Sequence, residues 1–114
     1  MPTRQGERSA PDVVDVLRAL ADPSRLRIFR ALRVSERCVR DLVETEGLSQ
    51  PLVSHHLRVL QEVGLVQNRR WDGFVLYAVD PRGLGLARDG VGELLDIDRL
   101  ADAALPGGNS NCCS

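Results

Sequence analysis

The chain has no long apolar segment, no lysine, and only three cysteines among its 114 residues. No run of apolar residues approaches the roughly 18 that are needed to cross a bilayer. Residues 1–11 are polar and have no hydrophobic region of the kind found in a signal peptide. These absences exclude a membrane protein, and they predict a single cytoplasmic domain with an ordinary hydrophobic core.

All fifteen basic residues are arginine, and they are unevenly distributed. Residues 1–70 contain 12 arginines and 9 acidic residues, whereas residues 71–114 contain 3 and 7. Six arginines fall in one stretch in which Glu36 is the only acid: Arg25, Arg27, Arg30, Arg33, Arg37 and Arg40. This stretch is either the solvated face of a helix or a phosphate-binding surface, and the second interpretation requires a groove-reading element nearby.

Apolar residues repeat at helical spacing in four segments before residue 65. The spacing predicts helices over residues 12–20, from residue 23 onward, over residues 37–46 and over residues 50–63. Pro23 and Pro51 suit the first turn of a helix, and Gly47 and Gly64 follow the last turns. The third of these helices would contain Cys38.

The rest of the chain predicts two strands and a last helix, over residues 65–70, 74–79 and 82–105. Asp72-Gly73 between alternating apolar residues is a strong hairpin signal. Pro81 ends the second strand, and glycines interrupt the final helical pattern.

This order of elements predicts a mainly α fold with a small β-hairpin, a winged helix-turn-helix. The first and last helices carry more apolar surface than one small domain can cover, so we expect a homodimer formed through the N- and C-terminal helices. The expected organisation is a flexible arm, a DNA-binding and dimerisation domain, and a flexible cysteine-bearing tail, over residues 1–11, 12–105 and 106–114.

The helix from residue 50 is the expected reader of double-stranded DNA. In a helix-turn-helix the second helix enters the major groove and reads bases with its early residues, which here are Ser49, Gln50, Pro51, Ser54 and His55. Gln50 can pair with adenine through two hydrogen bonds. Arg58, Arg69 and Arg70 are expected to neutralise phosphates, with the last two flanking the tip of the wing.

Ser49 and His56 have simpler structural explanations. Ser49 is equally well explained as a helix cap. His55 and His56 make a poor chelate for a metal ion, because adjacent side chains on a helix diverge by about 100°. His56 is expected to pack between helices.

Three stretches of the chain resemble the ArsR/SmtB family: residues 20–28 (Leu20-Ala21-Asp22-Pro23-Ser24-Arg25-Leu26-Arg27-Ile28), residues 48–60, which include Ser49-Gln50-Pro51 and Ser54-His55-His56, and Gly64-Leu65-Val66. The resemblance covers roughly residues 12–80. It implies a small dimeric winged-helix repressor that binds an inverted-repeat operator and leaves it on binding a metal or metalloid. It also implies that both terminal helices build the dimer.

Residues 37–42 are similar to the cysteine-bearing segment of family members that sense arsenic or cadmium. Those members commonly carry a further cysteine two residues after the first, where this chain has Arg40. Cys112 and Cys113 are the expected replacements, which makes Cys38, Cys112 and Cys113 the predicted inducer ligands. Adjacent cysteines do not easily form a disulfide, because their Cα atoms are about 3.8 Å apart and a disulfide needs roughly 4.4–6.8 Å.

Each candidate ligand also has a plainer interpretation. Cys38 could be a small buried hydrophobic residue, although Arg37 and Arg40 would favour its thiolate form. The tail pair could have no function, but a free pair of neighbouring thiols is an oxidation liability that gives no packing benefit.

The ligand set indicates which inducer to expect. Members of the family that use the last helix place His and Asp on it, and residues 82–105 contain no His, so a zinc or nickel site there is disfavoured. Three thiolates without a fourth ligand suit trivalent arsenic or antimony, supplied as arsenite or antimonite. Soft donors also accept cadmium or lead, and a methylated arsenical needs only two thiols.

Two other functions compete with a metalloid-responsive repressor. A redox-sensing repressor would join Cys38 to Cys112 or Cys113 as a disulfide. An enzyme such as a thiol-dependent arsenate reductase is disfavoured, because that chemistry needs an activated cysteine in an anion-binding loop. We therefore expect no enzymatic activity.

Overall fold

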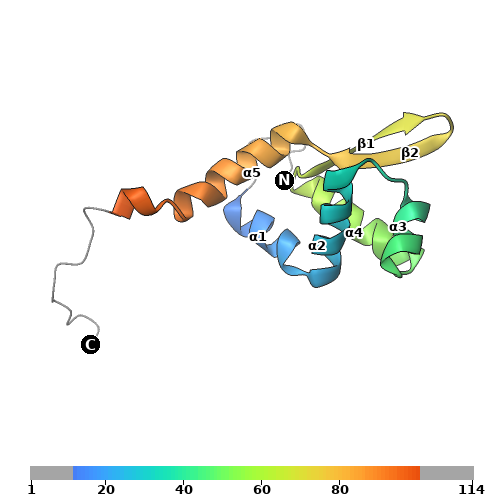
Figure 1. Cartoon of the computed structure of the whole chain (residues 1–114), viewed down its shortest axis with the longest axis horizontal. Helices are drawn as coiled ribbons and strands as arrows, with labels where there is room; N and C mark the ends of the chain where they lie inside the picture. The colour runs from blue at the N-terminus through green and yellow to red at the C-terminus, as the bar shows by residue number, and fades with distance from the viewer. Residues whose placement is uncertain (1–11, 101–114) are drawn as a thin grey trace, which may run out of the picture.

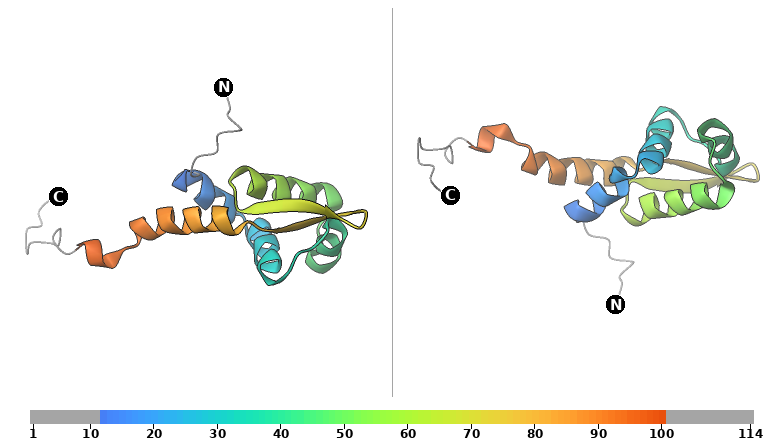
Figure 2. Two further views of the ribbon diagram at one scale, coloured as in Figure 1. Left: turned by 90° about the horizontal axis from the view of Figure 1, so that it is seen from above. Right: turned by 90° about the horizontal axis from the view of Figure 1, so that it is seen from below.

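The computed structural model describes residues 12–100. Its elements are α1 (Val13–Ala21), α2 (Pro23–Val34), α3 (Val39–Glu46), α4 (Gln50–Glu62), β1 (Val66–Trp71), β2 (Phe74–Val79), α5 (Pro81–Leu94) and the 3-10 helix η1 (Ile97–Leu100). Helices α1 to α4 form the body, the β1–β2 hairpin projects from one side, and α5 runs away from the body on the opposite side (Figures 1 and 2). The predicted mainly α fold with one hairpin is confirmed.

The hydrophobic core lies between α2, α3, α4 and the base of the hairpin. Its fully buried side chains include Ile28, Leu42, Val53, Leu57, Leu60 and Leu65. Complete burial of one such side chain contributes about 1.5–3 kcal/mol. Val16 and Ala19 of α1 are also buried and attach that helix to the body. The helical spacing had placed the core side of α4 correctly.

The turns before α2 and α5 have the same chemistry. Asp22 accepts hydrogen bonds from the backbone N–H groups of Ser24 at 2.9 Å and Arg25 at 3.1 Å, and Pro23 occupies the first turn. The bond from Arg25 is the main cause that lowers the pKa of Asp22. Asp80 caps α5 in the same way. An Asp-Pro pair therefore sets the start of both helices.

The hairpin has the two-residue turn that its sequence predicts. Trp71 pairs with Phe74, and Asp72 and Gly73 between them have φ angles of 49° and 83°, as a type I′ turn requires. The expected strand over 65–70 is displaced by one residue. Leu65 is fully buried and donates its N–H to the carbonyl of Leu60 at 3.0 Å, so β1 begins after it.

The start of α3 differs from the prediction. We expected a helix from Arg37, but Arg37 is extended and pairs with Tyr77 at the edge of β2. Its N–H donates to the carbonyl of Tyr77 at 3.0 Å, and the N–H of Tyr77 donates back at 2.8 Å. Cys38 is therefore the N-cap residue of α3 and not a residue within the helix.

The final helix was expected to run, with glycine interruptions, to Leu105, of which residues 101–105 lie outside the described residues. Helix α5 ends at Leu94, and the 3-10 helix η1 begins at Ile97. Asp96, just before η1, accepts the N–H of Asp98 at 3.1 Å. Helix α5 begins close to the α4–β1 turn, where a Cβ on Gly83 would collide with the carbonyl of Gly64. None of the helices within residues 12–100 is long and apolar enough to cross a membrane.

Candidate functional site

The turn between α3 and α4 positions the predicted reading helix. Gly47 ends α3 in the left-handed conformation, with φ at 67°, and Ser49 then caps α4 by accepting the N–H of Leu52 at 3.3 Å. The capping interpretation of Ser49 is confirmed. Because this bond uses only the hydroxyl oxygen as an acceptor, the hydroxyl hydrogen can still donate to an anion.

The outer side of α4 carries the predicted base-reading residues. We call this surface the reading face, formed by Gln50, Pro51, Ser54, His55 and Arg58. All of them are exposed except Ser54, which is half-buried. The other side of α4 fills the core through Val53, Leu57 and Leu60. Tight packing on one side and polar exposure on the other are what a groove-reading helix requires.

His56 lies on the core side of α4 and is only 4% exposed. A guanidinium nitrogen of Arg25 lies 3.1 Å from its Nδ1, and the Nε of the same arginine donates to the carbonyl of Ala19 at 2.7 Å. Arginine can only donate, so Nδ1 is an acceptor and the ring is neutral. Burial lowers the pKa of His56, and Arg25 adds to that shift. The expectation that His56 packs between helices is confirmed.

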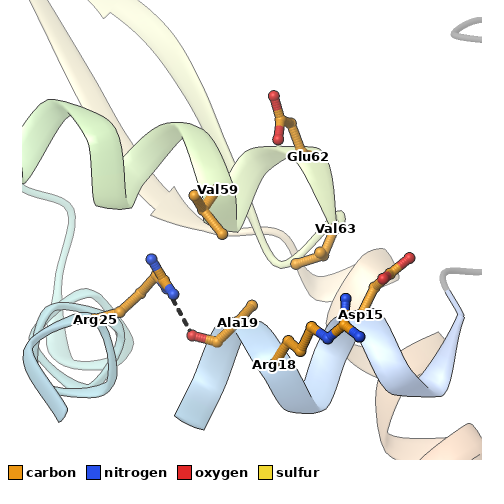
Figure 3. Close-up of a pocket in the computed structure, with 7 residues that line it drawn as sticks. All are labelled: Asp15, Arg18, Ala19, Arg25, Val59, Glu62 and Val63. Atoms are coloured by element: carbon orange, nitrogen blue, oxygen red, sulfur yellow. Dashed lines mark hydrogen bonds between the residues drawn. The ribbon is translucent and has the colours of Figure 1, made fainter. Parts of the chain in front are cut away.

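An open cleft of about 420 Å³ lies between α1 and the C-terminal end of α4 (Figure 3). Its charged lining residues are Asp15, Arg18, Arg25 and Glu62, with Arg25 bound to the Ala19 carbonyl (Figure 3). The acids and arginines are balanced in number, and the cleft lies at the opposite end of α4 from Gln50. It therefore does not extend the reading face.

The arginines between residues 25 and 40 do not form one surface. Arg25 is committed to internal contacts, as described above. Arg27 binds Glu46 through its side chain at 3.2 Å and its backbone carbonyl at 3.3 Å, which ties α2 to the end of α3. Arg37 donates to the hydroxyl of Ser35 at 3.1 Å. The remaining members are exposed: Arg30, Arg33 and Arg40. The stretch is therefore divided between arginines with partners inside the chain and exposed arginines, and phosphate binding by the exposed ones stays a prediction.

The two wing arginines have different surroundings. Arg69 forms a two-pronged ion pair with Glu36, with N···O distances of 2.8 and 2.9 Å, and this bond raises the pKa of the guanidinium. Arg70 is exposed and lies on the other face of the strand, because neighbouring strand residues alternate. Sequence reasoning missed Glu36 as a partner of the wing, although it is the only acid between Arg25 and Arg40.

Cys38 is half-buried and has a free thiol. Among residues 12–100, no three His, Cys, Asp or Glu side chains are placed to hold a metal ion together. Cys112 and Cys113 lie outside the residues that the structure describes, so a site built from all three thiols stays a prediction.

Residues 22–68 match the family model described as bacterial regulatory protein, arsR family. The HTH-type transcriptional repressor SmtB of Mycobacterium tuberculosis is 48% identical over 63 residues, which are 55% of this chain and 47% of that protein. The match thus spans about half the length of that relative. The arsenical resistance operon repressor of Staphylococcus xylosus is 34% identical over 94 residues, which are 82% of this chain and 86% of that protein.

A solved structure from Mycobacterium bovis has the same architecture. It is a homodimeric winged helix-turn-helix DNA-binding domain, described as a possible ArsR-family transcriptional regulator. It is 27% identical, with a TM-score of 0.60 over 84% of this chain and 87% of that one. These proteins are named as regulators of transcription rather than as enzymes. The resemblance seen in the sequence is confirmed, and this chain belongs to the ArsR family of bacterial regulatory proteins.

Proposed function

We propose that the protein is a homodimeric transcriptional repressor that binds an inverted-repeat operator and is released by trivalent arsenic or antimony. The observation that carries the DNA-binding part is the exposed reading face of α4 beside a hairpin with two arginines. The names of the relatives support the same class of function.

Different residues of the reading face and the wing suit different parts of the operator, the base edges and the phosphates. Gln50 at the start of α4 suits a base edge in the major groove, where one good pair discriminates by about 1–3 kcal/mol. Ser49 and Ser54 suit phosphate or base contacts, and Arg58 and Arg70 suit phosphates. Two copies related by a twofold axis would read half-sites about 34 Å apart, which is the reason for an inverted repeat.

Exposed apolar side chains support the dimer. Val14 and Leu17 of α1 and Leu86 of α5 are 44–51% exposed, and Leu94, Leu95 and Ile97 are 64–74% exposed. A second copy of the same helices would cover these side chains. The homodimeric M. bovis structure supports this assembly.

Cys38, Cys112 and Cys113 are the proposed ligands of the inducer. Trivalent arsenic and antimony form three bonds to sulfur, and residues 12–100 supply one of these donors at the start of α3. The soft thiolate chemistry fits the ion, and the tail supplies the other two thiols. The name of the S. xylosus relative supports an arsenical inducer.

The position of Cys38 supports a route from the inducer to the DNA-binding surface. The residue before it is hydrogen-bonded to β2, and its own carbonyl accepts the N–H of Leu42 at 3.3 Å. A force on Cys38 therefore acts on the wing and on α3, which leads into α4. Each tenfold preference of the inducer for the DNA-free form amounts to about 1.4 kcal/mol of coupling.

The test is a titration of the full-length protein with a labelled fragment of its own promoter, followed by addition of arsenite under reductant. We expect tight binding, preference over random duplex, and release by arsenite but not by zinc. Cadmium and an oxidant in separate reactions distinguish the alternative inducers. Cys38→Ser should bind the fragment normally and release poorly. Loss of DNA binding in metal-free Cys38→Ser protein would show that Cys38 is structural, and the proposed thiolate site would be rejected.

A further inference from the structure

We propose that Glu36 competes with DNA phosphate for Arg69, and that this internal carboxylate lowers the affinity of the protein for all DNA sequences. The inference deepens the proposed function, since it rests on the wing contacting DNA. It assigns an opposing role to a residue that lies outside the helix-turn-helix.

The backbone places Glu36 against Arg69. Arg37 pairs with Tyr77 at the outer edge of β2, so the segment before α3 runs beside the hairpin like a short third strand. Arg69 pairs with Leu76, the residue before Tyr77, on the other side of β2. Paired residues of adjacent strands share a face, so Arg69 lies on the face of Leu76 and Arg37 on the face of Tyr77. Neighbouring residues alternate between faces, and Glu36 therefore lies on the same face as Leu76 and Arg69.

The geometry of the pair matches the geometry of a phosphate contact. Nε and one terminal nitrogen of Arg69 reach the two carboxylate oxygens of Glu36 at 2.9 and 2.8 Å. Guanidinium groups bind carboxylates and phosphates through the same two-pronged arrangement. While Glu36 occupies this edge of the guanidinium, a phosphate cannot bind there.

The exposure of the pair makes an exchange possible. The side chain of Arg69 is 55% exposed and that of Glu36 is 38% exposed. Exposed ion pairs contribute little to stability, so DNA can displace the carboxylate. Part of the free energy of the Arg69–phosphate contact is then spent on breaking the ion pair with Glu36, so the net contribution of Arg69 to DNA affinity is smaller than that of an unpaired arginine.

The pair between Arg27 and Glu46 shows what a structural ion pair looks like in this chain. The Glu46 side chain is only 15% exposed, and Arg27 also binds the Glu46 backbone carbonyl. That second bond ties α2 to the end of α3. Arg69 has no such backbone bond to Glu36 among the contacts within residues 12–100, so the Glu36 carboxylate is not needed to join two helices.

The experiment compares Glu36→Gln with Glu44→Gln, an exposed acid on α3 that gives the same change in net charge. Binding to a random-sequence duplex is measured by fluorescence anisotropy at several salt concentrations. We expect Glu36→Gln to bind about three- to ten-fold more tightly. The slope of log K against log salt should steepen by about 0.9, as one further phosphate is neutralised. Glu44→Gln should change affinity less than two-fold.

A third and a fourth variant, Arg69→Ala and Glu36→Gln/Arg69→Ala, test whether the gain acts through Arg69. In the Arg69→Ala background the Glu36→Gln substitution should give no gain beyond that of Glu44→Gln. An unchanged or lower affinity of Glu36→Gln, or a gain that persists without Arg69, would overturn the inference. Promoter preference and arsenite release test the proposed function separately, because the random duplex reports only on phosphate contacts.

Discussion

The two ends of the molecule expose different kinds of side chain. At the hairpin end, the reading face and the wing present glutamine, serine, histidine and arginine, with Trp71 and Phe74 as exposed aromatic residues at the tip. At the other end, α5 and η1 present Leu94, Leu95 and Ile97, each more than 60% exposed. The first surface suits a polyanion and the second suits a copy of itself. We therefore expect the contacts with DNA and the contacts between two copies of the chain to use separate residues.

Arg25 of α2 joins α1 to the reading helix α4. Its guanidinium contacts the carboxyl-terminal part of α1 through Ala19 and the middle of α4 through His56. A change in this contact is expected to alter how the dimer helices are oriented relative to α4.

The largest effect is expected from breaking the apolar end. In Leu94→Glu/Leu95→Glu, four carboxylates would have to enter the dimer interface. The monomer should remain folded, because both side chains are already exposed in the single chain. A monomer would contact only one half-site of the operator, so its operator affinity should be weaker by about 100-fold or more. Sedimentation velocity and operator anisotropy measure both effects, with Glu93→Gln on the same helix as the control. A stable dimer in the double variant would show that α5 is not the interface.

The next effect concerns the response to arsenite. Deletion of residues 106–114 should leave a dimer that binds its operator normally, because α5 and η1 end before the cut. With one thiol left per chain, an ion that needs three sulfur bonds should require at least about ten-fold more arsenite for half-release. Trp71 fluorescence and release of labelled operator report the response. Cys112→Ser/Cys113→Ser at full length is the matched variant, and full release from either protein would exclude the tail thiols.

Two substitutions at the hairpin end distinguish base reading from phosphate contact. Gln50→Ala should change which operator is preferred, at a cost of about 1–3 kcal/mol at one base pair. Arg70→Ala should weaken binding to all sequences alike and flatten the salt dependence by about one ion. A panel of single-base operator variants at three salt concentrations separates the two patterns. Equal losses on every sequence for Gln50→Ala would place base reading elsewhere.

The sequence predicted the local features of this fold better than its long-range contacts. The Asp72-Gly73 turn, the Ser49 cap and the proline starts follow from interactions within four residues, and the structure has all of them. The position of Cys38 was misjudged because the residue before it pairs with Tyr77, about 40 positions later. The partner of Arg69 was missed for the same reason, since Glu36 is 33 positions away.

The pattern of exposed residues was predicted where helical periodicity decides it. Val53, Leu57 and Leu60 are buried, as the spacing requires, while Gln50 and Arg58 are exposed. Charge counting was less informative, because the arginines between residues 25 and 40 have internal and external roles that composition does not distinguish. The inducer site could be predicted only as a set of thiols, since Cys112 and Cys113 lie outside the residues that the structure describes.

The smallest expected effect is a pH dependence at the contact between Arg25 and His56, which joins α1 to α4. Burial lowers the pKa of His56 in the folded chain, whereas an unfolded histidine has a pKa near 6.5. Above that pH the ring is neutral in both states and makes no pH-dependent contribution. Below it the unfolded chain binds a proton that the folded chain resists, and the free energy of unfolding falls as pH decreases toward the folded-state pKa.

A single histidine can change the free energy of unfolding by at most about 1.4 kcal/mol per pH unit. Urea unfolding of the chain from pH 8 to pH 5 measures this slope. The slope should be shallower for His56→Gln than for the control His55→Gln. The control keeps the buried ring and alters only its exposed neighbour. Identical slopes for the two variants would mean that the Arg25–His56 contact tolerates protonation. In that case the packing of α1 against α4 through Arg25 would not depend on a neutral His56 ring.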